Sequence, residues 1–127
     1  MTADILLVDD NAVQASTRRS ILLRTGRPVE LASGASQALA MLEDAALLGS
    51  IALVITDHCM PGMNGPEFVA RLRHRLPSVP VVVLSGYPDV ESEYEGMHVV
   101  FRLTPLAPDQ LIALAETLLE PPLTRTA

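Results

Sequence analysis

Short apolar runs separated by helix-forming stretches recur along the chain, and this alternation constrains the fold more than any other feature of the sequence. Four of the runs are nearly continuous, which favours strands that are buried on both faces of a sheet. They cover residues 5–8, 51–55, 79–84 and 99–103. A fifth run, residues 29–32, is weaker and is typical of an outer strand.

The stretches between these runs have the composition and spacing of amphipathic helices. We expect helices over residues 11–25, 35–48, 66–76 and 108–119. In the first of them, Ala15, Ile21 and Leu22 are expected on one apolar face. Residues 88–96 contain three glutamates and little periodicity, so only a brief or frayed helix is expected there. Five alternations predict an α/β fold with parallel strands, right-handed crossovers and helices on both faces of the sheet.

Composition limits the domain count and the classes of partner. The 127 residues suffice for one domain, expected over residues 1–120 and followed by a flexible tail over residues 121–127. A net charge of −6 argues against non-specific binding to nucleic acid or to anionic membranes. The single cysteine, Cys59, rules out an internal disulfide and a cysteine-based zinc site. We find no membrane-span or signal-peptide pattern, so a cytoplasmic location is expected.

Three aspartates follow two of the predicted strands. Asp9 and Asp10 come directly after the first run, and Asp57 follows the run at residues 51–55. Ligands of doubly wound sheets bind beyond the carboxyl ends of the strands, so we expect the three carboxylates to meet at one rim. Such like charges need a cation, and an all-oxygen site suits Mg²⁺ better than zinc. The plainer interpretation, helix capping, explains Asp10 but not all three acids.

Two further segments follow strands at the same edge. Ser85 and Gly86 come after the fourth run and offer a hydroxyl and accessible backbone N–H groups to an anion, although ordinary turn chemistry explains them as well. Residues 57–65 form a long turn with one proline and two glycines. Such a turn could direct a backbone carbonyl toward a metal.

These motifs resemble those of response-regulator receiver domains, the CheY-like domains of two-component signalling. The resemblance covers about residues 4–119. It is carried by Leu7-Val8-Asp9-Asp10, Thr56-Asp57, Met60-Pro61-Gly62-Met63, Gly65-Pro66-Glu67, Leu84-Ser85-Gly86 and Pro105. The Asp-His-x-Met-Pro-Gly-Met stretch and Ser-Gly-Tyr are most similar to receivers attached to hybrid sensor kinases. The resemblance implies a flavodoxin-like, five-stranded sheet with strand order 2-1-3-4-5.

The resemblance also implies a role for each site residue. Asp57 would accept a phosphoryl group from a phosphohistidine of a sensor histidine kinase or a histidine phosphotransfer domain. The Mg²⁺ ligands would be Asp9, Asp10, Asp57 and the backbone carbonyl of Cys59. Ser85 would hydrogen-bond a phosphoryl oxygen, and Phe101 occupies the position of the aromatic switch residue. Such a domain is a regulatory phosphoacceptor, with no enzymatic activity beyond its own phosphorylation and dephosphorylation.

One residue of the family pattern is missing. Receivers normally carry a lysine before the proline that follows the fifth strand, but this position is Thr104 and the chain contains no lysine. Losing a charge-assisted contact to phosphate removes on the order of 1.5–3 kcal/mol. Because Mg²⁺ would still neutralise part of the charge, phosphorylation of Asp57 could survive, whereas its coupling to the switch is expected to be atypical. A cis bond between Thr104 and Pro105 is compatible with the sequence. Arg102 is expected to be the only nearby cation; we favour its lying in solvent or pairing with a glutamate of residues 91–95 over its replacing the lysine.

Other functions stay open at this point. The alternative is a pseudo-receiver, a constitutive protein-interaction module that is not phosphorylated. A small enzyme or flavin carrier is disfavoured because no glycine-rich phosphate loop follows the first strand. No DNA-binding segment is recognised after residue 120, so direct contact with nucleic acid is not expected, and neither is a membrane partner. The partner kinase, the output and a homodimeric state are left open.

Overall fold

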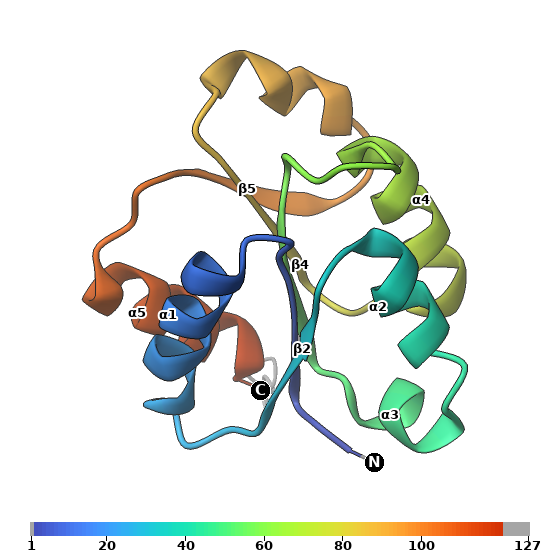
Figure 1. Cartoon of the computed structure of the whole chain (residues 1–127), viewed down its shortest axis with the longest axis vertical. Helices are drawn as coiled ribbons and strands as arrows, with labels where there is room; N and C mark the ends of the chain where they lie inside the picture. Colours follow the sequence, from blue (N-terminus) through green and yellow to red (C-terminus); the bar gives the residue numbers. More distant parts are fainter. Residues whose placement is uncertain (1, 121–127) are drawn as a thin grey trace, which may run out of the picture.

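Five parallel strands form one sheet in the order β2-β1-β3-β4-β5 (Figure 1). The computed structural model describes residues 2–120. The strands are β1 (Ile5–Val8), β2 (Val29–Ala32), β3 (Leu53–Asp57), β4 (Val81–Ser85) and β5 (Val99–Leu103). The predicted α/β class, the parallel sheet and the strand order are confirmed, and β2 is an outer strand as expected.

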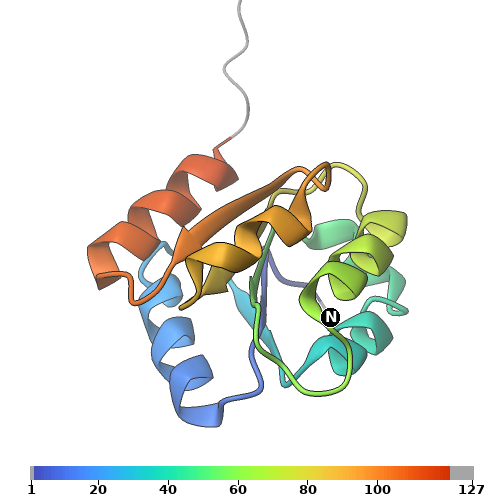
Figure 2. The ribbon, with the colours of Figure 1, turned by 90° about the horizontal axis from the view of Figure 1, so that it is seen from above.

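Helices cover both faces of the sheet, as predicted. They are α1 (Ala12–Leu23), α2 (Ala35–Met41), α3 (Ala45–Ser50), α4 (Gly65–Arg75), the 3₁₀ helix η1 (Pro88–Tyr94) and α5 (Pro108–Leu119). Seen from above, α1 and α5 lie on one face, α2, α3 and α4 lie on the other, and η1 lies beside β5 (Figure 2). No helix in the described part of the chain is long and apolar enough to cross a membrane. The tail predicted over residues 121–127 lies outside the described residues.

Apolar side chains form one core on each face of the sheet. Successive side chains of a strand point to opposite faces, so Leu6 and Val8 of β1 join the core under α2 and α4, whereas Ile5 and Leu7 join the core under α1 and α5. All four side chains of β1 are fully buried. By contrast, β5 is half-buried or exposed along its length. The prediction of a fully buried strand is therefore wrong for β5, because β5 is the second edge of the sheet.

The structure also corrects several element boundaries. The helix predicted over residues 35–48 is two separate helices. The Asp44 carboxylate accepts hydrogen bonds from the backbone N–H groups of Ala46 and Leu47, so Asp44 caps the start of α3. The third strand begins two residues later than predicted, at Leu53, and extends through Asp57. The fourth begins at Val81, after Pro80. The weak segment at residues 88–96 contains only the brief helix that was expected.

Candidate functional site

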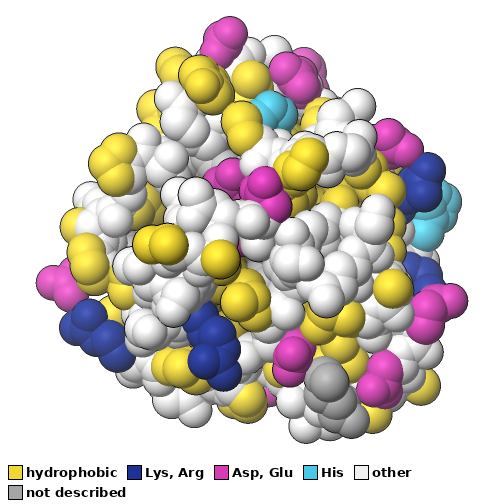
Figure 3. Space-filling model, in the orientation of Figure 1, with side chains coloured by type: hydrophobic (Ala, Val, Ile, Leu, Met, Phe, Trp, Pro, Cys, Tyr) yellow, Lys and Arg dark blue, Asp and Glu magenta, His cyan; other side chains and the backbone are white. Residues whose placement is uncertain are grey.

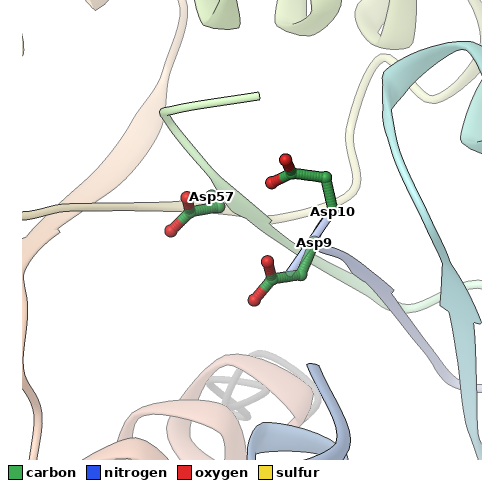
Figure 4. Close-up of side chains that lie close together, drawn as sticks. All are labelled: Asp9, Asp10 and Asp57. Atoms are coloured by element: carbon green, nitrogen blue, oxygen red, sulfur yellow. The ribbon is translucent and has the colours of Figure 1, made fainter. Parts of the chain in front are cut away.

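The carboxyl ends of two neighbouring strands bring three aspartates together (Figure 4). Asp9 and Asp10 follow β1, and Asp57 is the last residue of β3, which pairs with β1. One carboxylate oxygen of each aspartate lies within 4.8 Å of the others. Asp9 is buried, Asp57 is half-buried and Asp10 is exposed, so the cluster is open to solvent on one side. Three residues singled out in the sequence therefore form one cluster.

A buried arginine on α1 contacts two of these acids. Nη1 of Arg18 donates to Oδ2 of Asp9 at 2.9 Å and to Oδ1 of Asp57 at 3.2 Å. With its amide oriented to satisfy both neighbours, Gln14 donates to Asp9 Oδ2 at 3.0 Å and accepts from Arg18 Nη2 at 3.3 Å. The expectation that Arg102 is the only nearby cation is therefore wrong, because Arg18 reaches the pocket from the helix that follows Asp9 and Asp10.

Helix periodicity contained the signal for this arginine. The buried residues of α1 are Ala15, Arg18 and Leu22, at the spacing of three and four that defines one helix face. Ile21, which was expected on that face, is only half-buried. A buried arginine must be paired, since a lone charge in an apolar environment is costly. An arginine inside an apolar stripe, close to two acids in the sequence, was thus the missed indication.

Burial dominates the electrostatics of the two inner acids. Desolvation raises the pKa of Asp9 and of Asp57, while Arg18 acts in the opposite direction on both. The Asn11 backbone N–H donates to Asp9 Oδ1 at 3.0 Å, and this hydrogen bond also opposes the rise in the pKa of Asp9. One arginine for three carboxylates leaves the pocket negative. Such a set of oxygen ligands fits Mg²⁺.

The surface around the cluster matches this charge distribution. Acidic side chains gather near the middle of the face shown in Figure 3, and the arginines visible there lie apart from them. Cys59, two residues after Asp57, is exposed. Its carbonyl remains a metal ligand predicted from the sequence resemblance.

Ser85 and Thr104 lie at the ends of the next two strands. The Ser85 side chain is buried, accepts from the Tyr87 backbone N–H at 2.9 Å and donates to the Tyr87 carbonyl at 3.3 Å. The Thr104 backbone N–H donates to the Ser85 carbonyl at 2.8 Å, and the Thr104–Pro105 peptide bond is cis. Since Tyr87 immediately precedes η1, the Ser85 hydroxyl is bonded to the segment that begins this helix.

A cavity of about 440 Å³ lies between α1 and the segment that follows β5. Its walls are formed by Gln14, Thr17, Arg18, Ile21, Leu84, Thr104, Pro105, Leu106 and Leu111. Arg18 and Thr104 thus line the same space. Thr104, which stands where the resemblance implies a lysine, therefore lies on the wall of the same cavity as the buried arginine.

The two candidate residues on β5 have other surroundings. Arg102 is exposed, and its Nη1 donates to the Phe101 carbonyl at 2.9 Å, rather than to any of the three aspartates. The Phe101 ring is half-buried and lies 6.3 Å from the Tyr94 ring, centroid to centroid. Arg102 therefore lies in solvent, whereas Phe101 belongs to an aromatic cluster under η1.

This aromatic cluster is connected to Asp57 through the next residue. Nδ1 of His58 hydrogen-bonds the hydroxyl of Tyr94, and the two rings meet edge to face at 5.6 Å. Tyr94 is only 3% exposed, and burial raises the pKa of its hydroxyl. A Cβ at Gly65 would lie 1.8 Å from this hydroxyl oxygen, so the close contact requires glycine there. No motif or spacing in the sequence predicted this cluster.

The chain matches the family model described as the response regulator receiver domain over residues 5–102. The hydrogenase transcriptional regulatory protein HoxA of Cupriavidus necator is 32% identical over 114 residues, which are 87% of this chain and 23% of HoxA. The sensor kinase CckA of Brucella abortus is 35% identical over 89 residues, which are 69% of this chain and 9% of the kinase. The chain therefore spans a small part of these relatives.

Solved structures lead to the same family. The crystal structure of the receiver domain from the hybrid histidine kinase CckA has a TM-score of 0.77 and 31% sequence identity to this chain, and the match covers 92% of this chain and 99% of that one. A likeness to receivers of hybrid kinases was expected from the Asp57 turn and the Ser-Gly-Tyr stretch. Because the matched segment carries the aspartate cluster on the sheet observed here, the chain belongs to the response regulator receiver domain family of two-component signalling.

Proposed function

We propose that this receiver accepts a phosphoryl group on Asp57 from a phosphohistidine and signals through contacts with other proteins. Receivers of this family interact with histidine kinases or phosphotransfer proteins and bind Mg²⁺ in their aspartate cluster. The observation that carries the proposal is the position of Asp57. Its side chain is 16% exposed at the open rim, with Asp9 and Asp10 beside it and a guanidinium against Oδ1.

The transfer exchanges one bond to phosphorus for another. A carboxylate oxygen of Asp57 forms the new P–O bond, the P–N bond to the donor imidazole breaks, and the leaving imidazole takes up a proton. Arg18 favours the ionised, nucleophilic form of Asp57 because it lowers the pKa that burial raises. Mg²⁺, when held by Asp9, Asp10, Asp57 and the Cys59 carbonyl, would neutralise charge on the phosphoryl oxygens.

The signal would leave the pocket through Ser85. In this proposal the Ser85 hydroxyl gives up its hydrogen bonds to the Tyr87 backbone and binds a phosphoryl oxygen instead. The start of η1 is then released, and the packing of Phe101 changes. Thr104 supplies only a neutral hydroxyl where receivers usually have a lysine, so switching is expected to be atypical. The acidic net charge favours protein partners over direct contact with nucleic acid.

The test adds Mg²⁺ and then beryllofluoride, an analogue of the phosphoryl group, and follows the backbone amide signals of Asp57, Ser85 and Phe101 by NMR. We expect a beryllofluoride-dependent response at Asp57 in the natural chain and none in Asp57→Asn. No response at Asp57 would overturn the proposal and favour the alternative, a pseudo-receiver that acts as a constitutive interaction module. Thr104 in place of lysine is the observation that keeps this alternative in view. A response at Asp57 without one at Phe101 would overturn only the proposed route of switching.

A further inference from the structure

We propose that Arg18 binds the phosphoryl group held on Asp57, in place of the lysine that position 104 lacks. This inference rests on the proposed function of Asp57. It assigns to α1 a role that receivers normally give to the segment after the last strand. It also makes Arg18, rather than Arg102, the cation that compensates for the absence of lysine.

The Arg18 guanidinium lies directly against the proposed phosphorylation site. Nη1 of Arg18 already lies 3.2 Å from Oδ1 of Asp57, so oxygens of a phosphoryl group bonded to this carboxylate come within reach of the same side chain. A guanidinium has five N–H donors in a planar fork that matches phosphate, whereas its contacts here use Nη1 for the two aspartates and Nη2 for Gln14. Donors remain for a phosphoryl oxygen.

The other arginines of residues 2–120 lie away from the aspartate cluster. Four of them pair with acids away from the site: Arg24 with Asp109, Arg27 with Asp4, Arg71 with Glu67 and Arg75 with Glu43. Arg73 donates to backbone carbonyls near the start of β5, and Arg102 donates to the Phe101 carbonyl. Arg19 is exposed on α1. Arg18 alone among these described arginines contacts the aspartate cluster.

Arg18 shares a cavity with the position that normally carries the lysine. Arg18 and Thr104 both line the space of about 440 Å³ between α1 and the segment after β5. A lysine at position 104 would extend from the wall of this space, as the Arg18 side chain does. Arg18 and position 104 are therefore neighbours across this space, and the contact of Arg18 with Asp57 connects the space to the phosphoryl site.

Arg18 should have opposite effects on the binding of Mg²⁺ and of the phosphoryl group. Arg18 lies against Asp9 and Asp57, two of the three carboxylates that would hold Mg²⁺. It therefore removes part of the charge that attracts the metal before phosphorylation, yet it adds a favourable contact once the phosphoryl group is present. Replacing it should change the two binding reactions in opposite directions.

The experiment uses the full chain in its natural form and as Arg18→Gln, with Arg19→Gln as the control of equal charge on the same helix. Mg²⁺ alone is titrated first by calorimetry, and beryllofluoride is then titrated at saturating Mg²⁺. We expect Arg18→Gln to bind Mg²⁺ more tightly than the natural chain does. Its affinity for beryllofluoride should be lower by about tenfold or more. Arg19→Gln should match the natural chain in both titrations. In Arg18→Gln/Thr104→Lys, the lysine should restore most of the beryllofluoride affinity.

The outcomes distinguish this inference from the function on which it rests. If the natural chain does not bind beryllofluoride, both proposals are overturned. If it binds and Arg18→Gln binds equally well, only the role of Arg18 is overturned. A parallel loss of Mg²⁺ and beryllofluoride binding would also overturn it, because that result indicates a structural role.

A measurement on the natural chain keeps the proposal testable if Arg18→Gln does not fold. The side-chain N–H signals of Arg18 are followed by NMR while beryllofluoride is added at saturating Mg²⁺. They should shift as the guanidinium gains a new acceptor, and their staying unchanged while the Asp57 amide responds would overturn the proposal.

Discussion

Asp57 lies between two regions whose side chains differ in chemistry. Toward α1, the carboxylates of Asp9 and Asp57 meet the Arg18 guanidinium, so this region consists of buried charge. Toward η1, the His58 and Tyr94 side chains are connected by one hydrogen bond and by edge-to-face ring packing. Substitutions on the α1 side should therefore change the free energy of unfolding by an amount that depends on Mg²⁺. Substitutions on the η1 side should change it through side-chain packing. A buried charge needs a partner of opposite sign, and a buried hydroxyl needs only one hydrogen bond.

The largest expected effect comes from removing the cation of the α1 side. Arg18→Leu leaves the Asp9 carboxylate, whose side chain is 0% exposed, without its ion pair, which should reduce the free energy of unfolding by about 3–5 kcal/mol in the absence of metal. Mg²⁺ should restore part of this loss because it supplies the missing positive charge and binds the folded state. Urea unfolding with and without Mg²⁺ measures both effects. An equal loss under the two conditions would contradict the electrostatic account.

A smaller effect is expected from crowding the η1 side. Gly65→Ala places a methyl group 1.8 Å from the Tyr94 hydroxyl oxygen and 3.0 Å from His58 Nδ1, so the free energy of unfolding should fall by about 1–3 kcal/mol. The loss should be the same with and without Mg²⁺, unlike that of Arg18→Leu.

A double-mutant cycle with Tyr94→Phe provides the control for this contact. Removing the hydroxyl takes away the atom nearest to the new methyl group, so Gly65→Ala should cost less in the Tyr94→Phe background than in the natural chain. Equal costs in the two backgrounds would show that the clash lies elsewhere.

The pH dependence of stability offers a third comparison of the two sides. Burial raises the pKa of Tyr94 above its ordinary value of 10.0, so the folded state favours the neutral hydroxyl. This contribution to stability is fully present below pH 10 and is lost as the pH rises through the folded-state pKa, by at most about 1.4 kcal/mol per pH unit. Urea unfolding between about pH 8 and pH 11 should show a steeper alkaline decline in the natural chain than in Tyr94→Phe. Parallel declines would contradict the assignment to Tyr94.

The smallest effect is expected at Arg102, which belongs to neither side. Arg102→Ala removes an exposed side chain bonded to the neighbouring carbonyl, so the free energy of unfolding should change by no more than about 0.5 kcal/mol. Beryllofluoride affinity and the lifetime of phosphorylated Asp57 should also stay unchanged. A shortened lifetime would return Arg102 to the site and weaken the case for Arg18.

These two sides also differ in how far the sequence predicts them. The three aspartates were found because each directly follows a strand, and parallel strands carry their carboxyl ends to one edge. Arg18 was missed, although its spacing with Ala15 and Leu22 placed it on the buried face of α1. Tyr94 and Gly65 lie 29 positions apart, and no periodic pattern in the sequence relates them. Their contact exists only because η1 packs over the start of α4.

The sequence by itself determined the α/β class, the parallel sheet and the acidic rim, because these follow from local periodicity and from the order of strands and helices. The tertiary structure decided which groups meet the acids. Whether Arg18 or Arg102 reaches the pocket depends on how α1 packs against the sheet and on the exposed position of β5 at its edge. These are long-range contacts. A local pattern of apolar residues predicts which side of a helix is buried, but it does not predict which residues that side will contact. The sequence shows that the chain has no lysine, but only the fold shows that Arg18 contacts Asp57.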